Sequence, residues 1–199
     1  DGKGGPLGDA GDRIYLRLKE AAVTDAIQIV TRPVRQITIN TGRPWAEFRA
    51  DYEKRVPAFD RMEAIGTVLS GSGWEAIQRL STATATNGLV SFYTFDPSPV
   101  MAVNGNTGHT VTYLSGNIVE AEAGFRQNPG CFVYIPLRVV IFADAGGVAR
   151  LTIDHPADLF AAYADSVLDG IAAKFATTFA EILRQLDVPV PSVLLDAGA

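Results

Sequence analysis

The sequence predicts an α+β domain: a mostly antiparallel sheet with helices packed mainly on one face, and a long helix at its C-terminal end. Short stretches that alternate apolar and polar residues indicate strands, and the turn 145–147 joins two of them into a hairpin. Other stretches place apolar residues at steps of three and four, which is typical of helices. The last of these forms one continuous apolar face along residues 168–186.

Composition agrees with one globular domain and argues against several classes of partner. Of 199 residues, 47% are hydrophobic and 20% charged, and the net charge is −5. Because no run of Lys or Arg occurs, we expect neither nucleic acid nor a membrane as a partner. No signal peptide and no apolar stretch of about 18 residues appears, so we expect a cytoplasmic protein.

The sequence has one cysteine, Cys131, and two histidines, His109 and His155. A single cysteine excludes an intramolecular disulfide framework and a multi-cysteine metal site. Neither histidine lies in a pattern typical of metal ligands or of a haem ligand. We therefore expect no metal site and no cofactor.

We divide the chain into four parts. Residues 1–12 contain five glycines and a proline, which indicates a flexible leader. Residues 13–31 form an extension or arm that packs on the domain or on a second copy. Residues 32–191 form the single α+β domain, and residues 192–199 a tail.

The first half of the domain predicts one strand followed by helices. Alternation from Val34 to Thr41 indicates a half-buried strand that closes at Gly42, and Thr41 is a plausible cap for the next helix. That helix, in residues 41–59, carries Trp45, Phe48 and Tyr52 at helical spacing. Another begins with Ser72 as its cap and Glu75 three residues later, which is a capping box. We expect one or two helical turns between them.

The second half predicts four strands and two helices. Asn117 is a preferred residue for capping the first helix, which ends at Asn128-Pro129. Asp154 or Asp158 is a plausible cap for the second helix. The predicted strands are 89–96, 109–117, 131–144 and 148–154, the helices are 118–129 and 156–186, and residues 97–108 form an irregular connection.

Residues 32–191 resemble the bacterial and fungal proteins that carry the domain of unknown function number 302. The stretches "TGRPWAEFRADYEKRVPAFD", "YLSGN", "NPGCFVYIPLRVVIFADAGG" and "IDHPADLFAAYAD" carry this likeness. The resemblance implies a compact α+β domain that forms a dimer, and it assigns no activity. Shorter members have a Cys-Asn-Pro or Gly-Asn-Pro turn where this sequence has Gly116-Asn117-Ile118, so the proline differs.

Arg138 is the main candidate for a functional residue. It lies within the apolar strand predicted for residues 131–144, where a charge is costly unless it is paired. In strict alternation it shares a face with Tyr134 and Pro136, which suggests a lined pocket or an interface. Two readings stay open: Arg138 binds an anionic ligand, or it pairs with an acidic residue on a neighbouring strand.

These residues predict a binding domain for a small apolar or carboxylate-bearing molecule. The pocket would lie between the sheet and residues 97–108, with Arg138 holding the anionic group. Asn117 begins a helix, and its amide groups could hold a carboxylate or serve only as a cap. The remaining candidate ligand-binding residues are Tyr93, Met101 and Tyr134.

Two alternatives belong to other classes of function. In the first, a cofactor-free isomerase, cyclase or hydrolase uses His155 or His109 as a base, with Tyr134 or Arg138 as electrophilic stabiliser. In the second, the sheet face and the N-terminal arm serve only to form an oligomer, most simply a homodimer. Cys131 is expected to be a small buried hydrophobic residue rather than a nucleophile.

Overall fold

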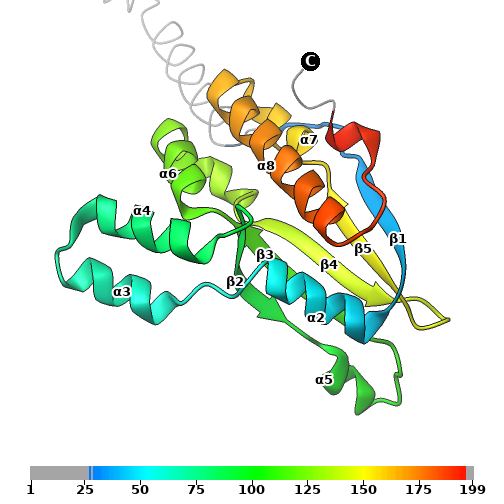
Figure 1. Cartoon of the computed structure of the whole chain (residues 1–199). Helices are drawn as coiled ribbons and strands as arrows, with labels where there is room; N and C mark the ends of the chain where they lie inside the picture. The colour runs from blue at the N-terminus through cyan, green and yellow to red at the C-terminus, as the bar shows by residue number, and fades with distance from the viewer. Residues whose placement is uncertain (1–26, 28, 196–199) are drawn as a thin grey trace, which may run out of the picture. The chain divides into compact units, whose positions relative to one another are not determined.

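The computed structural model describes residues 27 and 29–195 (Figure 1). The chain divides into two units, Asp1–Arg32 and Pro33–Ala199, and all helices and strands described here belong to the second. The predictions for residues 1–12 and for most of residues 13–31 lie outside the described residues.

Five strands form one antiparallel sheet in the order β1-β5-β4-β3-β2. β4 and β5 form the predicted hairpin. This confirms the α+β class and the antiparallel sheet. The strands are β1 Gln36–Pro44, β2 Val90–Phe95, β3 Thr110–Gly116, β4 Leu137–Ala143 and β5 Val148–Asp154.

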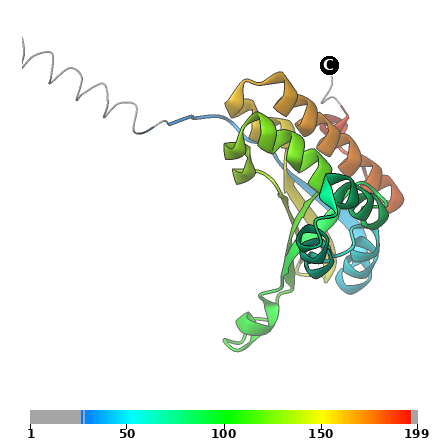
Figure 2. The same ribbon diagram turned by 90° about the vertical axis from the view of Figure 1, so that its left-hand side faces the viewer.

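The helices lie mainly on one face of this sheet, which leaves the other face open (Figure 2). Strand alternation explains this arrangement, because successive side chains point to opposite faces. On the covered face, β3 buries Val111 and Tyr113, and β4 buries Val139 and Ile141. The helices are α2 Trp45–Arg55, α3 Arg61–Leu69, α4 Gly73–Thr84, α5 Ser98–Ala102, α6 Ile118–Gln127, α7 Pro156–Phe160 and α8 Ser166–Gln185.

β1 continues further than predicted and takes up the residue expected to cap α2. It ends at Pro44, with an irregular register between Asn40 and Pro44. The hydroxyl of Thr41 donates to the carbonyl of Ala149 at 2.8 Å, so Thr41 ties β1 to β5. The N-cap of α2 is Pro44, which makes no side-chain capping bond. The predicted Thr41 cap was therefore wrong.

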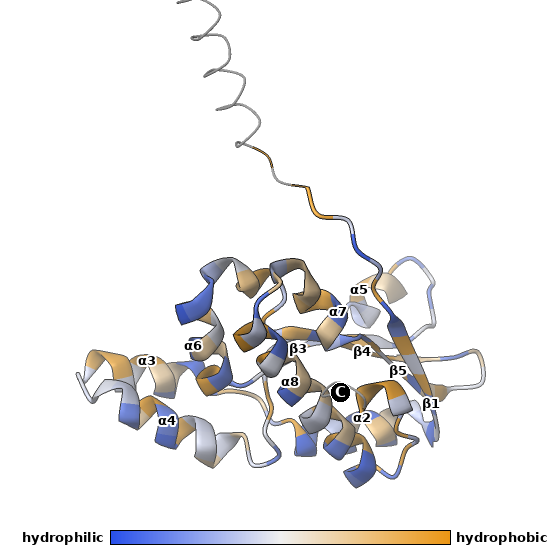
Figure 3. Cartoon of the chain, turned by 90° about the horizontal axis from the view of Figure 1, so that it is seen from above, coloured by the Kyte–Doolittle hydropathy of each residue, from blue (hydrophilic) through white to orange (hydrophobic). Residues whose placement is uncertain are grey.

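The segment between the first two predicted helices is helical, as expected, and α3 is slightly longer than predicted, with nine residues or about two and a half turns. It has no buried residue, and its large apolar residues Met62, Ile65, Val68 and Leu69 are all exposed. Figure 3 shows hydrophobic residues along this helix. The capping box at α4 was also wrong. Ser72 occupies the N-cap position, but its hydroxyl lies 2.6 Å from that of Ser70 and makes no capping bond.

Residues 131–144 are not one strand. Pro129–Val133 form a 3₁₀ helix, the Ile135–Pro136 peptide bond is cis, and β4 begins only at Leu137. Cys131 therefore lies in the 3₁₀ turn rather than at the start of a strand. Phe132, Tyr134 and Pro136 therefore do not form the predicted alternating strand face. Of the residues assigned to that face, Arg138 is the first that lies in β4.

The predicted helix 156–186 consists of three pieces. α7 is followed by a 3₁₀ turn, Ala161–Tyr163, and by Ala164 with a positive φ of 47°. The carboxylate of Asp165 then caps α8 by accepting from the amides of Val167 and Leu168. The predicted apolar face of the long helix is confirmed, because Leu168, Ile171, Phe175, Phe179 and Ile182 of α8 are all buried.

Helix ends elsewhere follow the sequence. Asn117 caps α6 by accepting from the amide of Val119 at 2.9 Å, and Asn128 ends it. The N-cap of α7 is His155, and no side chain makes a capping bond there, so neither Asp154 nor Asp158 has the predicted capping role. Within residues 27 and 29–195, no helix combines the length and apolar composition that a membrane span requires.

Candidate functional site

A pocket of about 440 Å³ lies where β3, β4 and β5 meet the irregular segment before β4. Its lining runs from exposed side chains, such as Phe132, Val133 and Arg138, to the buried Ser115 and Phe179. The pocket therefore combines an accessible entrance with an apolar inner wall. The other lining residues are Leu89, Leu114, Tyr134, Ile135, Pro136, Leu137, Val139, Ile153, Asp154 and Leu159.

Local packing holds the segment that forms one wall. The side chain of Asn128 accepts from the amide of Gly130 at 2.8 Å, which starts the 3₁₀ turn. Cys131 is buried beneath it, and a Cβ at position 124 would lie 3.1 Å from its sulfur, so Gly124 lets α6 approach closely. The ring of Tyr134 packs against the ring of Phe160 in α7, with centroids 6.1 Å apart.

Arg138 lies on the open face of the sheet and is exposed. It pairs across strands with Leu114 of β3. On its other side the register places Asp154 of β5, because Val139 pairs with Ile153 one position further on. Among the residues that the structure describes, no carboxylate oxygen lies within 4.0 Å of its guanidinium group and no hydrogen bond is formed. For the predicted alternative, a salt bridge from Arg138 to an acidic residue, these residues therefore offer no partner.

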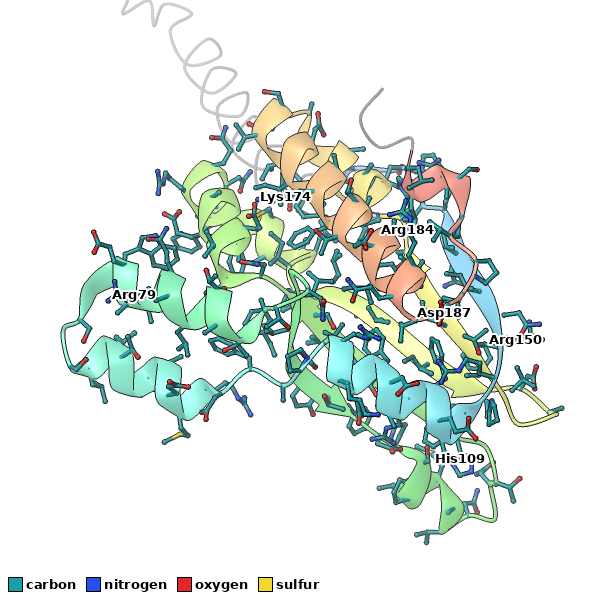
Figure 4. All side chains as sticks on the ribbon, viewed as in Figure 1. Arg79, His109, Arg150, Lys174, Arg184 and Asp187 are labelled. Atoms are coloured by element: carbon teal, nitrogen blue, oxygen red, sulfur yellow. The ribbon has the colours of Figure 1, made fainter. Side chains whose placement is uncertain are left out.

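Arg150, a second arginine on this face, behaves differently. Its Nη2 and Nε lie 2.8 and 3.0 Å from Oδ2 of Asp144, in the β4–β5 hairpin. Figure 4 places Arg150 on β5 near this hairpin. One arginine of the open face is thus neutralised by the protein, whereas Arg138 keeps its charge available at the pocket.

His155 is held by structural contacts. It is 2% exposed, its Nδ1 lies 3.2 Å from Nη2 of Arg35, and its Nε2 lies 3.0 Å from the carbonyl oxygen of Val193. Because a carbonyl only accepts, Nε2 carries the hydrogen and Nδ1 accepts from Arg35. Both ring nitrogens are occupied, and His155 does not line the pocket.

Asp158 completes this cluster, in which His155 is buried, Asp158 partly buried and Arg35 exposed. Arg35 donates to its carboxylate from the backbone amide at 2.8 Å and from Nη2 at 2.6 Å. These hydrogen bonds, the side-chain bond first, lower the pKa of Asp158 to about 2 even though partial burial opposes the shift. The cluster joins the start of β1 to α7 and the chain after α8.

His109 lies between α2 and α5 (Figure 4), and it is not among the residues that line the pocket with Arg138. Its ring stacks on that of Trp45 with centroids 4.8 Å apart, and both line a second hollow of about 550 Å³. The charged groups of this hollow are already paired, because Nη1 of Arg49 lies 2.6 Å from Oδ2 of Asp96. It therefore lacks the unpaired charge found in the first pocket.

Of the five residues predicted to bind a ligand, the structure brings Tyr134 and Arg138 into one pocket. Tyr93 lies outside its lining, half exposed on β2 beside Leu114. Met101 is half exposed in α5, and Asn117 caps α6. The pocket thus lies at the end of β3, the start of β4 and the end of β5 rather than beside residues 97–108.

Sequence reasoning missed Asp154, which lines the pocket next to Arg138. Its strand alternates, with Ala149, Leu151 and Ile153 buried, so Asp154 could have been placed on the open face. The neighbouring arginine could not have been identified without the register between β4 and β5.

The structure gives no support for thiol or metal chemistry. Burial raises the pKa of the Cys131 thiol, which makes the thiolate harder to form. Within the described part of the chain, no three His, Cys, Asp or Glu side chains lie close enough together to hold a metal ion.

Comparisons with known proteins agree with this picture of the fold. No curated protein matches the sequence. A crystal structure described as an uncharacterized conserved protein DUF302 from Bacillus stearothermophilus is similar, with a TM-score of 0.54 and 16% identity over 76% of this chain and 97% of that one. The family model for the domain of unknown function DUF302 matches residues 66–186, from α3 to the end of α8. The chain therefore belongs to the DUF302 family.

Proposed function

We propose that the pocket beside Arg138 binds a small molecule whose carboxylate pairs with this arginine and whose apolar part lies against the aromatic and aliphatic wall. The observation that carries the proposal is the exposed guanidinium at the pocket, with no carboxylate within 4.0 Å among the described residues. A guanidinium offers two parallel N–H groups that match a carboxylate.

The rest of the lining supports a ligand that is partly apolar. Leu114, Phe132, Pro136 and Leu159 surround the charge, and Phe179 lies at the buried end. Burial of apolar surface in such a wall contributes most of the binding free energy of a small ligand, and the charge of Arg138 fixes the orientation of its carboxylate. The volume of about 440 Å³ falls within the usual range for small-molecule sites.

Titration calorimetry with short branched carboxylates tests this proposal. Isocaproate should bind, and its uncharged amide should bind about tenfold more weakly, because the charge-assisted hydrogen bonds to Arg138 are lost. Arg138→Gln should weaken isocaproate to the level of the amide. Arg150→Gln is the matched control and should change nothing. Equal binding of acid and amide, or an unaffected Arg138→Gln variant, would contradict the proposal.

A second candidate function is dimerisation through the open face. Tyr93 and Phe95 are each 49% exposed on β2, next to Leu114, and Val140 and Phe142 continue the apolar row on β4. Open sheet faces of this kind pack against another sheet with their strands aligned or crossed. A twofold axis would bring the same row of both copies together.

Sedimentation velocity distinguishes a monomer from a dimer. We expect a dimer at micromolar concentration that Phe95→Asp dissociates, since a buried unpaired carboxylate is costly. Met62→Asp is the control, because Met62 is 75% exposed on α3, away from the sheet. A monomeric wild type would overturn this second function and leave the ligand proposal standing.

The catalytic alternative has no comparable support. His155 has both nitrogens engaged, and His109 stacks on Trp45 outside the pocket that contains Arg138. Neither histidine lines the pocket that contains Tyr134 and Arg138. A histidine-based reaction stays a prediction from the sequence.

A further inference from the structure

We propose that the ligand of the Arg138 pocket carries a protonated amine as well as a carboxylate, and that Asp154 binds this amine. The ligand class is then a zwitterion with an apolar side chain, such as a free aliphatic amino acid. This inference rests on the proposed function, because it concerns the same pocket and assigns its second charged residue.

Asp154 lies near Arg138 in the β4–β5 hairpin. The amide of Asp144 donates to the carbonyl of Val148 at 2.9 Å, which fixes the hydrogen-bonded pairs of the β4–β5 hairpin at every second position. The last registered pair is Val139–Ile153, and continuing the same alternation by one position sets Arg138 opposite Asp154, at a hydrogen-bonded position where Cα atoms are typically about 5.5 Å apart and side chains share a face. Both side chains line the pocket.

Arg138 and Asp154 do not form an ion pair with each other. Opposite charges at facing positions of antiparallel strands commonly attract each other. Here no guanidinium nitrogen lies within 4.0 Å of the Asp154 carboxylate, and neither side chain has a hydrogen-bond partner among the described residues. Arg150 and Asp144 on the same face do pair, at 2.8 Å, so the open face does not itself prevent pairing.

The charge of Asp154 limits which ligands Arg138 can bind well. A simple carboxylate bound to Arg138 would bring its negative charge close to Asp154, which is half-buried and partly shielded from water. An ammonium group on the carbon next to the carboxylate changes this repulsion into attraction. One molecule can then bridge both side chains, as a zwitterion does when each end finds the opposite charge.

The remaining walls favour an aliphatic side chain on that ligand. Leu114 and Leu159 contribute branched aliphatic surface, and Phe132 and Pro136 contribute flat apolar surface. Apart from Arg138 and Asp154, no lining residue of the described pocket is charged. A second charged group on the ligand would lack a partner there.

Three probes of one shape test the inference by calorimetry: leucine, isocaproate, which lacks the amine, and isoamylamine, which lacks the carboxylate. Leucine should bind about tenfold more tightly than isocaproate, because Asp154 adds a charge-assisted contact that solvent only partly screens. Asp154→Asn should reduce leucine to the level of isocaproate and leave isocaproate unweakened. Arg138→Gln should weaken both, and unchanged thermal unfolding of both variants shows that they are folded.

The outcomes separate this inference from the proposed function. If isocaproate binds in an Arg138-dependent way but leucine binds no better, or keeps its advantage in Asp154→Asn, the zwitterion inference is wrong and the carboxylate site stands. If none of the three probes binds at millimolar concentration, the proposed function itself fails.

Discussion

The two faces of the sheet are built from alternate residues of the same strands, yet they satisfy their polar groups differently. On the covered face, the Tyr113 hydroxyl donates to Glu53 at 2.8 Å and the Tyr52 hydroxyl lies 3.3 Å from that of Ser115. On the open face, Arg138 and Asp154 have no such partner among the described residues. Burial requires a partner for each polar group, whereas contact with solvent does not.

This difference assigns separate tasks to the two faces. The covered face contains the side chains whose burial stabilises the fold, and burial raises the pKa of Tyr52 there. The open face is more exposed to solvent, and we propose that its two charges at the pocket, Arg138 and Asp154, bind a ligand. The following predictions test whether stability and binding are divided in this way.

The largest effect is expected from neighbours on β4 that face opposite sides. Ile141 is fully buried, whereas Val140 is half-buried on the open face. Ile141→Ala should lower the free energy of unfolding by about 3 kcal/mol, because it removes buried methyl groups and leaves a cavity. Val140→Ala should cost less than about 1 kcal/mol. Urea unfolding measures both, and equal losses would show that the open face is buried in solution.

A smaller effect is expected where the chain approaches α8. Gly88 has a φ of 86°, and a Cβ there would lie 2.6 Å from Cγ2 of Thr178. Gly88→Ala should destabilise the protein by about 2 kcal/mol, through backbone strain and overpacking together. The control is Gly105→Ala, where φ is 77° but nothing lies within 4 Å. It should cost about 1 kcal/mol from strain alone. If thermal unfolding shows that both variants lose the same stability, the close approach of residue 88 to α8 contributes nothing to the loss.

Acid should remove the contribution of Asp158. Its pKa of about 2 in the folded protein lies below the value of about 4 in an unfolded chain, so its ion pair stabilises the fold above about pH 4 and is lost as pH falls toward 2. Solvent reaches Arg35, so we expect about 1 kcal/mol. The stability gap between wild type and Asp158→Asn should narrow over this pH range. A gap independent of pH would contradict the assignment.

The smallest effect separates the two arginines of the open face. Arg150→Gln removes an ion pair and should cost about 0.5 kcal/mol at low salt. Arg138→Gln removes no ion pair among the described residues and should leave the free energy of unfolding unchanged within about 0.3 kcal/mol. A larger loss for Arg138 would mean that this residue stabilises the fold rather than a ligand.

Much of the fold could be predicted because it depends on local periodicity. The apolar residues of α8 recur at helical steps, and the five of the predicted apolar face that lie within α8 are all buried. The alternation in β5 and the cap at Asn117 are equally local. The prediction failed for residues whose side chain could either cap a helix or bond elsewhere. Thr41 and Ser72 each fit a helix cap, but one donates to β5 and the other contacts Ser70.

Apolar composition also misled the prediction for residues 131–144. A run of apolar residues fits a buried strand, a buried turn or a strand edge equally well. Contacts with α6 and α7 decide between them, since Cys131 packs beneath Gly124 and Tyr134 packs on Phe160. These contacts bring together segments that lie far apart in the sequence, so no local pattern reveals them.

The sequence by itself therefore determined the α+β class and most of the element order, and it drew attention to Arg138, because each depends on neighbouring residues or on one unusual charge. Only the tertiary structure decided that His155 is buried between Arg35 and Val193, and that Arg138 lies beside Asp154. The physical reason is register: which charges meet across a sheet depends on how strands align, and alignment is set by packing of the whole domain.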